Sequence, residues 1–111
     1  MSASPQKKTE SNPADRVIVE NVNVPGYKNS LDATMYNAMK TALLEVLPKN
    51  EPGLTQTEMR EAVLPHLSEK LFPDGGKAGW WAKAVQLDLE AKKIIVREKT
   101  KPLRWHQNLN Q

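Results

Sequence analysis

The stretch 77–92 constrains the fold more than any other, because it predicts a helix with apolar residues on two sides. At about 100° per residue, Trp81 and Leu89 fall on one side of this helix. Trp80 and Leu87 fall on a second side. A helix of this kind is largely buried or contacts a partner. Since the chain has 111 residues, which suit one domain, we expect this helix to be a core element of a single small domain.

An extended segment and a helix are predicted in the first half of the chain. Residues 16–24 are rich in β-branched side chains and alternate in part, which indicates a short strand or an extended arm. Leu and Met residues at helical spacing predict a helix over 31–47, capped by Ser30 or Asp32. Pro48 ends this helix, because proline lacks the backbone donor that a helix needs.

The second helix has the clearest local signature in the chain. Thr55 and Glu58 form the pattern of a capping box, in which each side chain accepts a hydrogen bond from the backbone amide of the other residue. Pro65 ends or kinks this helix. A sharp loop over 72–76 follows, and the third helix, 77–92, comes directly after it.

The folded part of the chain ends in a predicted β-hairpin. Residues 94–98 form one strand, 99–102 the turn and 103–106 the returning strand. With a short strand at Gly53-Leu54 joining the hairpin, the order of elements is that of a winged helix-turn-helix. We therefore expect a mainly α fold with a C-terminal β-hairpin (α+β), winged helix-turn-helix-like, with three helices plus a wing.

The predicted domain covers 16–106, and its residues 16–27 form an N-terminal extended arm. Residues 1–15 are rich in Ser, Pro, Lys and Asn without periodicity, which predicts a disordered tail, and 107–111 are expected to fray. No segment has the apolar core of a signal peptide, and none is long enough to span a membrane. We therefore expect a cytoplasmic protein without membrane contact.

Few residues suit catalysis or metal binding. The chain has no Cys, which excludes disulfides and thiolate chemistry. His66 and His106 have no metal-binding partner at a suitable spacing and no obvious nucleophile beside them. Asp88 lies among the apolar residues of the third helix, so we expect it to cap or pair internally. We therefore expect no enzyme activity, no metal and no cofactor.

Positive charge is concentrated near the C-terminus. Residues 76–111 contain eight Lys or Arg and three Asp or Glu, whereas residues 1–75 contain eight and ten. This asymmetry favours a polyanionic partner, and its alternative is an ordinary solvated surface. We predict DNA binding through the N-terminus of the third helix and the basic wing. The candidate residues are Lys77, Lys83, Gln86, Lys93, Arg97, Lys99, Lys101 and Arg104.

The second apolar side of the third helix suggests a different function. Trp80 and Leu87 need a cover, which is either the arm 16–27 or a second copy of the chain. If they stay exposed, the domain is a protein–protein interaction module with a protein partner or a homodimeric state. The three Trp can also stack on single-stranded nucleic acid, but we predict that Trp81 and Trp105 fill the core.

Three segments, 20–27, 53–67 and 77–106, resemble a family of small uncharacterised bacterial proteins. The most specific signature is the combination of GWW, QLDLEAK and PLRW in the last segment. The resemblance covers most of the predicted fold and implies a bacterial cytoplasmic protein without an established activity. More distantly, the last three elements resemble winged-helix domains of DNA regulators. Those domains usually carry Gly at the position of Lys93, so the end of the third helix stays open.

Overall fold

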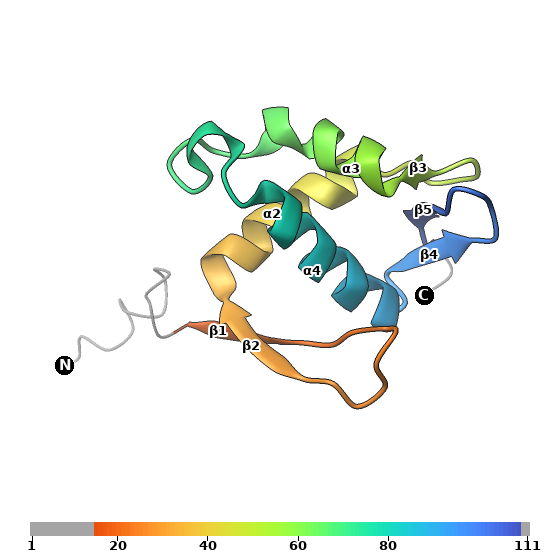
Figure 1. Cartoon of the computed structure of the whole chain (residues 1–111), viewed down its shortest axis with the longest axis horizontal. Helices are drawn as coiled ribbons and strands as arrows, with labels where there is room; N and C mark the ends of the chain where they lie inside the picture. Colours follow the sequence, from red (N-terminus) through yellow and green to blue (C-terminus); the bar gives the residue numbers. More distant parts are fainter. Residues whose placement is uncertain (1–14, 110–111) are drawn as a thin grey trace.

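Three α-helices and two small antiparallel sheets make up the structure, a computed structural model that describes residues 15–109 (Figure 1). The fold is therefore mixed α+β, and residues 1–14 of the predicted tail lie outside the described part. Within that part, no helix is long and apolar enough to cross a membrane. The elements are β1 (Arg16–Val19), β2 (Asn29–Asp32), α2 (Ala33–Val46), β3 (Leu54–Thr55), α3 (Gln56–Val63), the short 3-10 helices η1 (Leu64–His66) and η2 (Pro73–Gly75), α4 (Ala78–Ala91), β4 (Ile95–Glu98) and β5 (Arg104–Gln107).

Helix α4 occupies the middle of the fold. In Figure 1 it crosses in front of α2, with α3 on one side and the hairpin of β1 and β2 on the other. It packs against both α2 and α3. The side that carries Trp81 and Leu89 is buried, as predicted. On the second side Leu87 is half-buried and Trp80 is exposed, so the two apolar sides of this helix have different surroundings.

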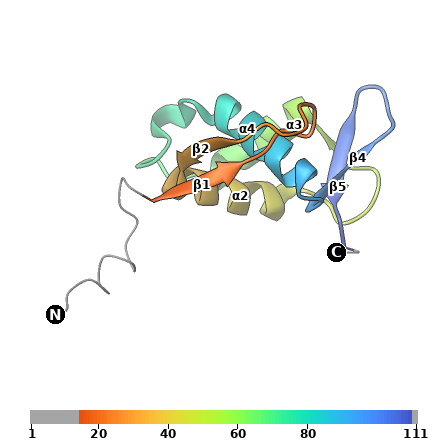
Figure 2. The same cartoon turned by 90° about the horizontal axis from the view of Figure 1, so that it is seen from below.

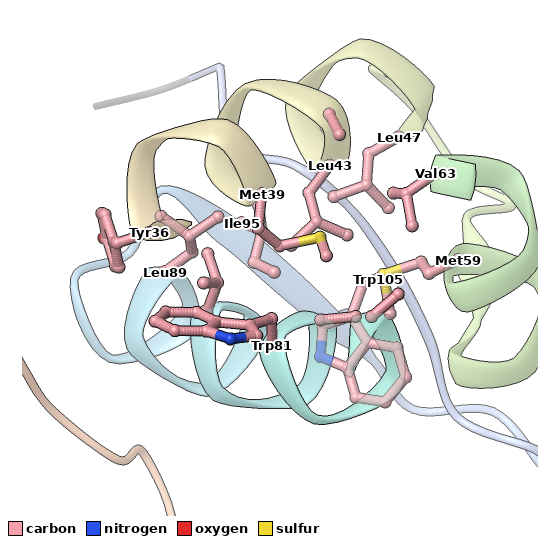
Figure 3. Packing of buried hydrophobic residues seen from close by; sticks show 14 of the residues in the cluster. Tyr36, Met39, Leu43, Leu47, Met59, Val63, Trp81, Leu89, Ile95 and Trp105 are labelled. Carbon is pink, nitrogen blue, oxygen red and sulfur yellow. The ribbon is translucent and has the colours of Figure 1, made fainter. Parts of the chain in front are cut away.

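One hydrophobic core joins the helices and the C-terminal sheet (Figure 3). Met39 and Leu43 point from α2 into this core, to which Leu89 of α4 also belongs. Trp81 and Trp105, the two Trp predicted to fill the core, are both buried there. Burying large apolar side chains of this kind stabilises the fold by about 1.5–3 kcal/mol each.

The first two helices begin at predicted caps. The Asp32 carboxylate accepts a hydrogen bond from the Met35 amide at 2.9 Å, so Asp32 and not Ser30 is the cap of α2. At α3 the Glu58 amide donates to the Thr55 hydroxyl at 3.1 Å, and the Thr55 amide donates to the Glu58 carboxylate at 2.9 Å. The capping box is confirmed. The backbone hydrogen bond from Thr55 lowers the pKa of Glu58 below its usual value.

Helix α4 ends with Lys93 in a left-handed backbone conformation, at a φ of 63°. The Ile94 amide donates to the Leu89 carbonyl at 2.8 Å, and the Lys93 amide donates to the Glu90 carbonyl at 3.1 Å. These two bonds form the helix ending that usually has glycine at its left-handed position. Lys93 therefore takes the glycine position of that ending, which explains why the sequence pattern left the helix end open.

The C-terminal sheet has the strand order β3-β5-β4. Leu54 of β3 pairs with Trp105 of β5, and Trp105 pairs on its other side with Arg97 of β4. The short strand expected at Gly53-Leu54 is thus present one residue later, at Leu54–Thr55. A Cβ atom added to Gly53 would lie 1.8 Å from the Trp105 carbonyl oxygen. Glycine is required at this approach, because every other residue would clash with the neighbouring strand.

The N-terminal hairpin, residues 16–32, differs from the predicted single arm. Strand β1 pairs with β2, with Val17 opposite Leu31. The prediction that the first helix starts at Leu31 is wrong, because Leu31 and Asp32 belong to β2 and the helix starts at Ala33. Leu31 is buried, and its apolar side chain was read as part of the helical pattern although it faces the core from a strand.

Gln107 is the last residue of β5 and does not fray. Its amide donates to the Pro48 carbonyl at 2.9 Å. Its side chain donates to the carbonyl oxygens of Leu44 and Leu47, each at 2.9 Å. The end of α2 is therefore capped by a residue about sixty positions later in the chain.

Candidate functional site

Gln86 does not face outward, contrary to its predicted role as a base-reading residue. Only 1% of its surface is exposed. The Gln86 carbonyl accepts from the Gln56 amide group at 2.9 Å, and the Gln86 amide group donates to Glu90 at 3.2 Å. Because α3 places Gln56 over this side of α4, Gln86 makes an internal contact between the two helices.

Arg97 contacts Glu90, the residue that also accepts a hydrogen bond from Gln86. Its Nε atom lies 2.8 Å from a carboxylate oxygen of Glu90, and its guanidinium lies 5.8 Å from the centre of the Trp105 ring. Glu90 also accepts from the Trp105 indole at 3.0 Å. A half-buried Arg with these partners connects β4 to α4. Arg97, predicted to contact nucleic acid, therefore has partners inside the fold.

Arg104 also has internal partners. Its Nη1 atom donates to the Gly53 carbonyl at 2.9 Å and to the Glu58 carboxylate at 3.2 Å. The side chain thus ties β5 to the start of β3 and α3. The distribution of charge along the sequence does not predict these internal bonds of Arg104, because Gly53 and Glu58 lie about fifty residues earlier in the chain.

The exposed cations among the predicted residues lie along α4 and at the tip of the C-terminal hairpin. Lys77 precedes α4 with a left-handed backbone, and Lys83 extends from the middle of the helix. Lys93 is exposed at the far end of α4, while Lys99 and Lys101 occupy the turn between β4 and β5. Figure 2 shows this hairpin standing at one end of the helices, with the N-terminal hairpin along their side.

A pocket of about 200 Å³ lies between α3 and α4 and is here called the basic groove. Arg60 and Lys83 are its two charged residues, and no carboxylate lines it. Lys83 lies 3.5 Å from the side-chain oxygen of Gln56, which turns its ammonium toward α3. The full lining is Gln56, Met59, Arg60, Gly79, Ala82, Lys83 and Gln86.

Arg60 was absent from the predicted set, although the sequence held a signal for it. Gln56 and Arg60 are four residues apart, so they share one face of a helix. Arg60 lies in the second helix, outside the C-terminal third in which positive charge is concentrated. In the structure this face of α3 meets Lys83 of α4 across the basic groove.

A second pocket, of about 180 Å³, lies between the N-terminal hairpin and α4 and is here called the Trp80 pocket. Trp80 is 56% exposed at this pocket, so the N-terminal segment, one of the two covers considered, leaves much of it uncovered. Leu87 is half-buried, so the hairpin shields part of the second apolar side. The full lining is Val19, Glu20, Asn21, Tyr27, Asn29, Leu31, Trp80, Lys83, Ala84 and Leu87.

His106 and Glu98 form a close pair in the C-terminal sheet. The Nδ1 atom of His106 lies 2.7 Å from a Glu98 carboxylate oxygen, which also accepts from the Gly53 amide at 2.7 Å. Glu98 is buried, so these bonds satisfy its carboxylate inside the protein. Within residues 15–109, no group of three His, Asp or Glu side chains is placed to hold a metal ion.

Comparison with known proteins places the chain in a family. A sequence model described as a family of unknown function (DUF6958) matches residues 16–105, which include both hairpins and the helices between them. No curated protein and no solved structure matches the chain. The resemblance to an uncharacterised family is confirmed at this level, since the match spans most of the chain. The chain therefore belongs to DUF6958, a family of unknown function.

Proposed function

We propose that this domain is of winged-helix type and binds nucleic acid through a basic face. That face consists of the basic groove together with Lys77, Lys99 and Lys101. The observation that carries the proposal is the basic groove, where Arg60 and Lys83 meet between two helices with no carboxylate in the lining. Two cations spaced across such a groove suit the phosphates of a nucleic-acid backbone.

The arrangement of elements supports the winged-helix part of the proposal. α3 and α4 take the places of the two helices of a helix-turn-helix, and the C-terminal hairpin takes the place of the wing. In that architecture the start of the first helix, the exposed side of the second and the wing tip contact the nucleic acid together. A nucleic-acid ligand also agrees with the bacterial cytoplasmic protein that the resemblance implies.

The contacts available on this face favour the backbone of the nucleic acid over its base edges. Gln86 is buried, and Arg97 and Glu90 pair with each other, so the middle of α4 offers few groups to a major groove. Lys83 and Arg60 can neutralise phosphates of any sequence. We therefore propose binding with little sequence preference and a strong dependence on salt.

Fluorescence anisotropy with a labelled duplex, titrated over a series of KCl concentrations, tests this proposal. The logarithm of the affinity is expected to fall linearly with the logarithm of salt concentration. Lys83→Gln and Arg60→Gln should each weaken binding and reduce the salt slope by about one, as the loss of one phosphate contact predicts.

Lys40→Gln provides the matched control, because Lys40 lies on α2, behind α4 in Figure 1. It removes the same charge and should leave the slope unchanged. The proposal fails if the wild-type protein shows no salt-dependent binding at low ionic strength and tens of micromolar protein, about the weak end of non-specific affinities.

A protein–protein interaction module is the second candidate function. It is favoured by the 56% exposure of Trp80, an aromatic residue of the kind that anchors interfaces. The occupant would be a protein partner or a second copy of the chain. Sedimentation velocity at rising protein concentration measures the second possibility, and a protein that stays monomeric at every concentration removes it.

A further inference from the structure

We propose that the Trp80 pocket binds one unpaired nucleobase, with Trp80 as its stacking surface. The inference rests on the proposed function, since it assigns single-stranded or locally opened nucleic acid as a ligand of the same face. A pocket of about 180 Å³ is smaller than the roughly 300–1,000 Å³ of sites for drug-sized ligands. Its size therefore suits one ring system and not a larger cofactor.

The aromatic residues of the pocket are accessible at its rim. Trp80 is 56% exposed and Tyr27 is 40% exposed. The Trp80 ring contacts the buried Trp81 ring in an edge-to-face arrangement, with centroids 5.1 Å apart and planes at 81°. This contact holds Trp80 against the core, so a base that stacks on it meets an oriented ring. Stacking on aromatic side chains is the usual way in which proteins hold unpaired bases.

The remaining lining residues offer apolar contacts to the ring of a base and polar groups to its edges. Val19, Leu31 and Leu87 give the pocket an apolar wall. The polar side chains of Asn21 and Asn29 can donate to and accept from base edges. Glu20 is the one carboxylate in the lining, and it can accept from the exocyclic amine that cytosine, adenine and guanine carry.

Lys83 connects this pocket to the basic groove, because it lines both of them. A strand whose phosphate lies at Lys83 can therefore place the neighbouring base over Trp80. Because the two pockets share Lys83, a nucleobase is favoured over an apolar peptide. An apolar peptide carries no phosphate that the adjoining cations could bind. A second copy of the chain is disfavoured on the same ground, since the cation shared by the two pockets suits a polyanion.

Binding of a single strand and of the matching duplex, measured with two Trp80 variants, tests the inference. Trp80→Leu keeps an apolar side chain but removes the stacking ring, whereas Trp80→Phe keeps a ring. Trp80→Leu should weaken binding of a labelled single-stranded oligonucleotide by about 5- to 150-fold, the range that one stacked base contributes. Trp80→Phe should retain most of that affinity, and neither variant should change duplex binding by more than about twofold.

Tryptophan fluorescence of the wild-type protein gives a readout that needs no variant. Trp80 is the exposed tryptophan, so a single strand that stacks on it should quench the emission, and the duplex should quench it less. Because Trp80 is exposed, both variants are expected to fold, which thermal melts check.

The outcomes separate this inference from the proposed function. Salt-dependent duplex binding with no loss of single-strand affinity in Trp80→Leu overturns the inference and leaves the proposed function standing. Absence of binding to either nucleic acid overturns both. A concentration-dependent dimer that Trp80→Leu dissociates also overturns the inference, because it assigns the pocket to a second copy of the chain.

Discussion

Asp88 joins three parts of the protein through one carboxylate that is 0% exposed. It accepts hydrogen bonds from the Tyr36 hydroxyl on α2 and from the Glu20 amide, the latter at 2.8 Å. Lys92, one turn further along α4, lies 2.9 Å from it. The expectation of an internal partner is met, and the carboxylate is satisfied by three donors from separate elements. The N-terminal hairpin is thereby fixed to the helices at a defined point.

Tyr36 gives this cluster a dependence on alkaline pH. Burial, followed by the hydrogen bond to Asp88 and its negative charge, raises the pKa of Tyr36 above the ordinary value of about 10. Above that pH the unfolded chain releases the phenolic proton while the folded protein retains it. The stabilisation is therefore complete below about pH 10 and is lost as pH rises beyond it.

Tyr36→Phe should be less stable than the wild type by about 1–2 kcal/mol at pH 7, because Asp88 loses one donor. The difference should shrink as pH rises from 10 to 11, since only the wild type has this proton to lose from the unfolded chain. Urea denaturation of both proteins at each pH measures this difference in the free energy of unfolding. Tyr27→Phe removes an exposed hydroxyl and should change stability at pH 7 by less than about 0.5 kcal/mol. An equal difference at every pH would contradict the prediction.

At the scale of elements, the ending of α4 combines a regular hydrogen-bond pattern with an unfavourable residue. Lys93 has a φ of 63°, a conformation that costs a residue with a side chain roughly 1–2 kcal/mol. Glycine avoids this clash but loses more backbone entropy on folding. The helix therefore has the geometry of a glycine ending without the residue that stabilises it best.

Lys93→Gly should accordingly stabilise the domain by about 1 kcal/mol, measured by urea denaturation at neutral pH. Glu45→Gly, at an exposed position within α2, is the matched control. It should destabilise by a similar amount, because glycine there only adds backbone entropy to the unfolded chain. Destabilisation by both substitutions would show that relief of the left-handed φ at Lys93 is outweighed by the backbone entropy that glycine adds.

Sequence patterns predicted those elements whose signals are local. The cap of α3 depends on Thr55 and Glu58, three residues apart, and it was recognised for that reason. Strand β2 is not predicted because its apolar Leu31 fits a helical pattern equally well, and only the pairing with β1 shows that this residue belongs to a strand. The burial of Gln86 could not be predicted either, since it depends on Gln56, thirty residues away.

The same distinction holds for the candidate site. The charge pattern predicts Lys83 as a contact residue, and Lys83 is exposed, but the same pattern also predicts Arg97 and Arg104, which have internal partners. Net charge does not reveal which cations are neutralised within the fold. The Trp80 pocket needed the hairpin of β1 and β2, which the sequence suggested only as an arm.

At the scale of the whole molecule, Gln107 connects the last strand, β5, to the first helix, α2, through hydrogen bonds. Its three hydrogen bonds reach Pro48, Leu44 and Leu47 at the end of α2. The last carbonyls of a helix have no partner within the helix itself, and Gln107 supplies donors at this end of α2. The two ends of the domain are therefore coupled in stability.

Gln107→Ala removes the two side-chain bonds and should lower the free energy of unfolding by about 1–2 kcal/mol. The corresponding decrease in Tm is about 5–10 °C for a domain of this size. Leu109→Ala, at a residue that is 60% exposed, is the control and should leave Tm unchanged. Equal melting temperatures for wild type and Gln107→Ala would show that α2 needs no partner at its C-terminal end.

The contact between Glu20 and Asp88 has a consequence for the order in which the protein is completed on the ribosome. The two residues are 68 positions apart. At synthesis rates of about 5–20 residues per second, Glu20 is made roughly 3–14 seconds before Asp88. During that interval Val19 and Leu31, which are buried in the finished domain, lack the surface that covers them. Among residues 15–109, the hairpin that is synthesised first is therefore exposed longest to chaperones and to other nascent chains before it packs.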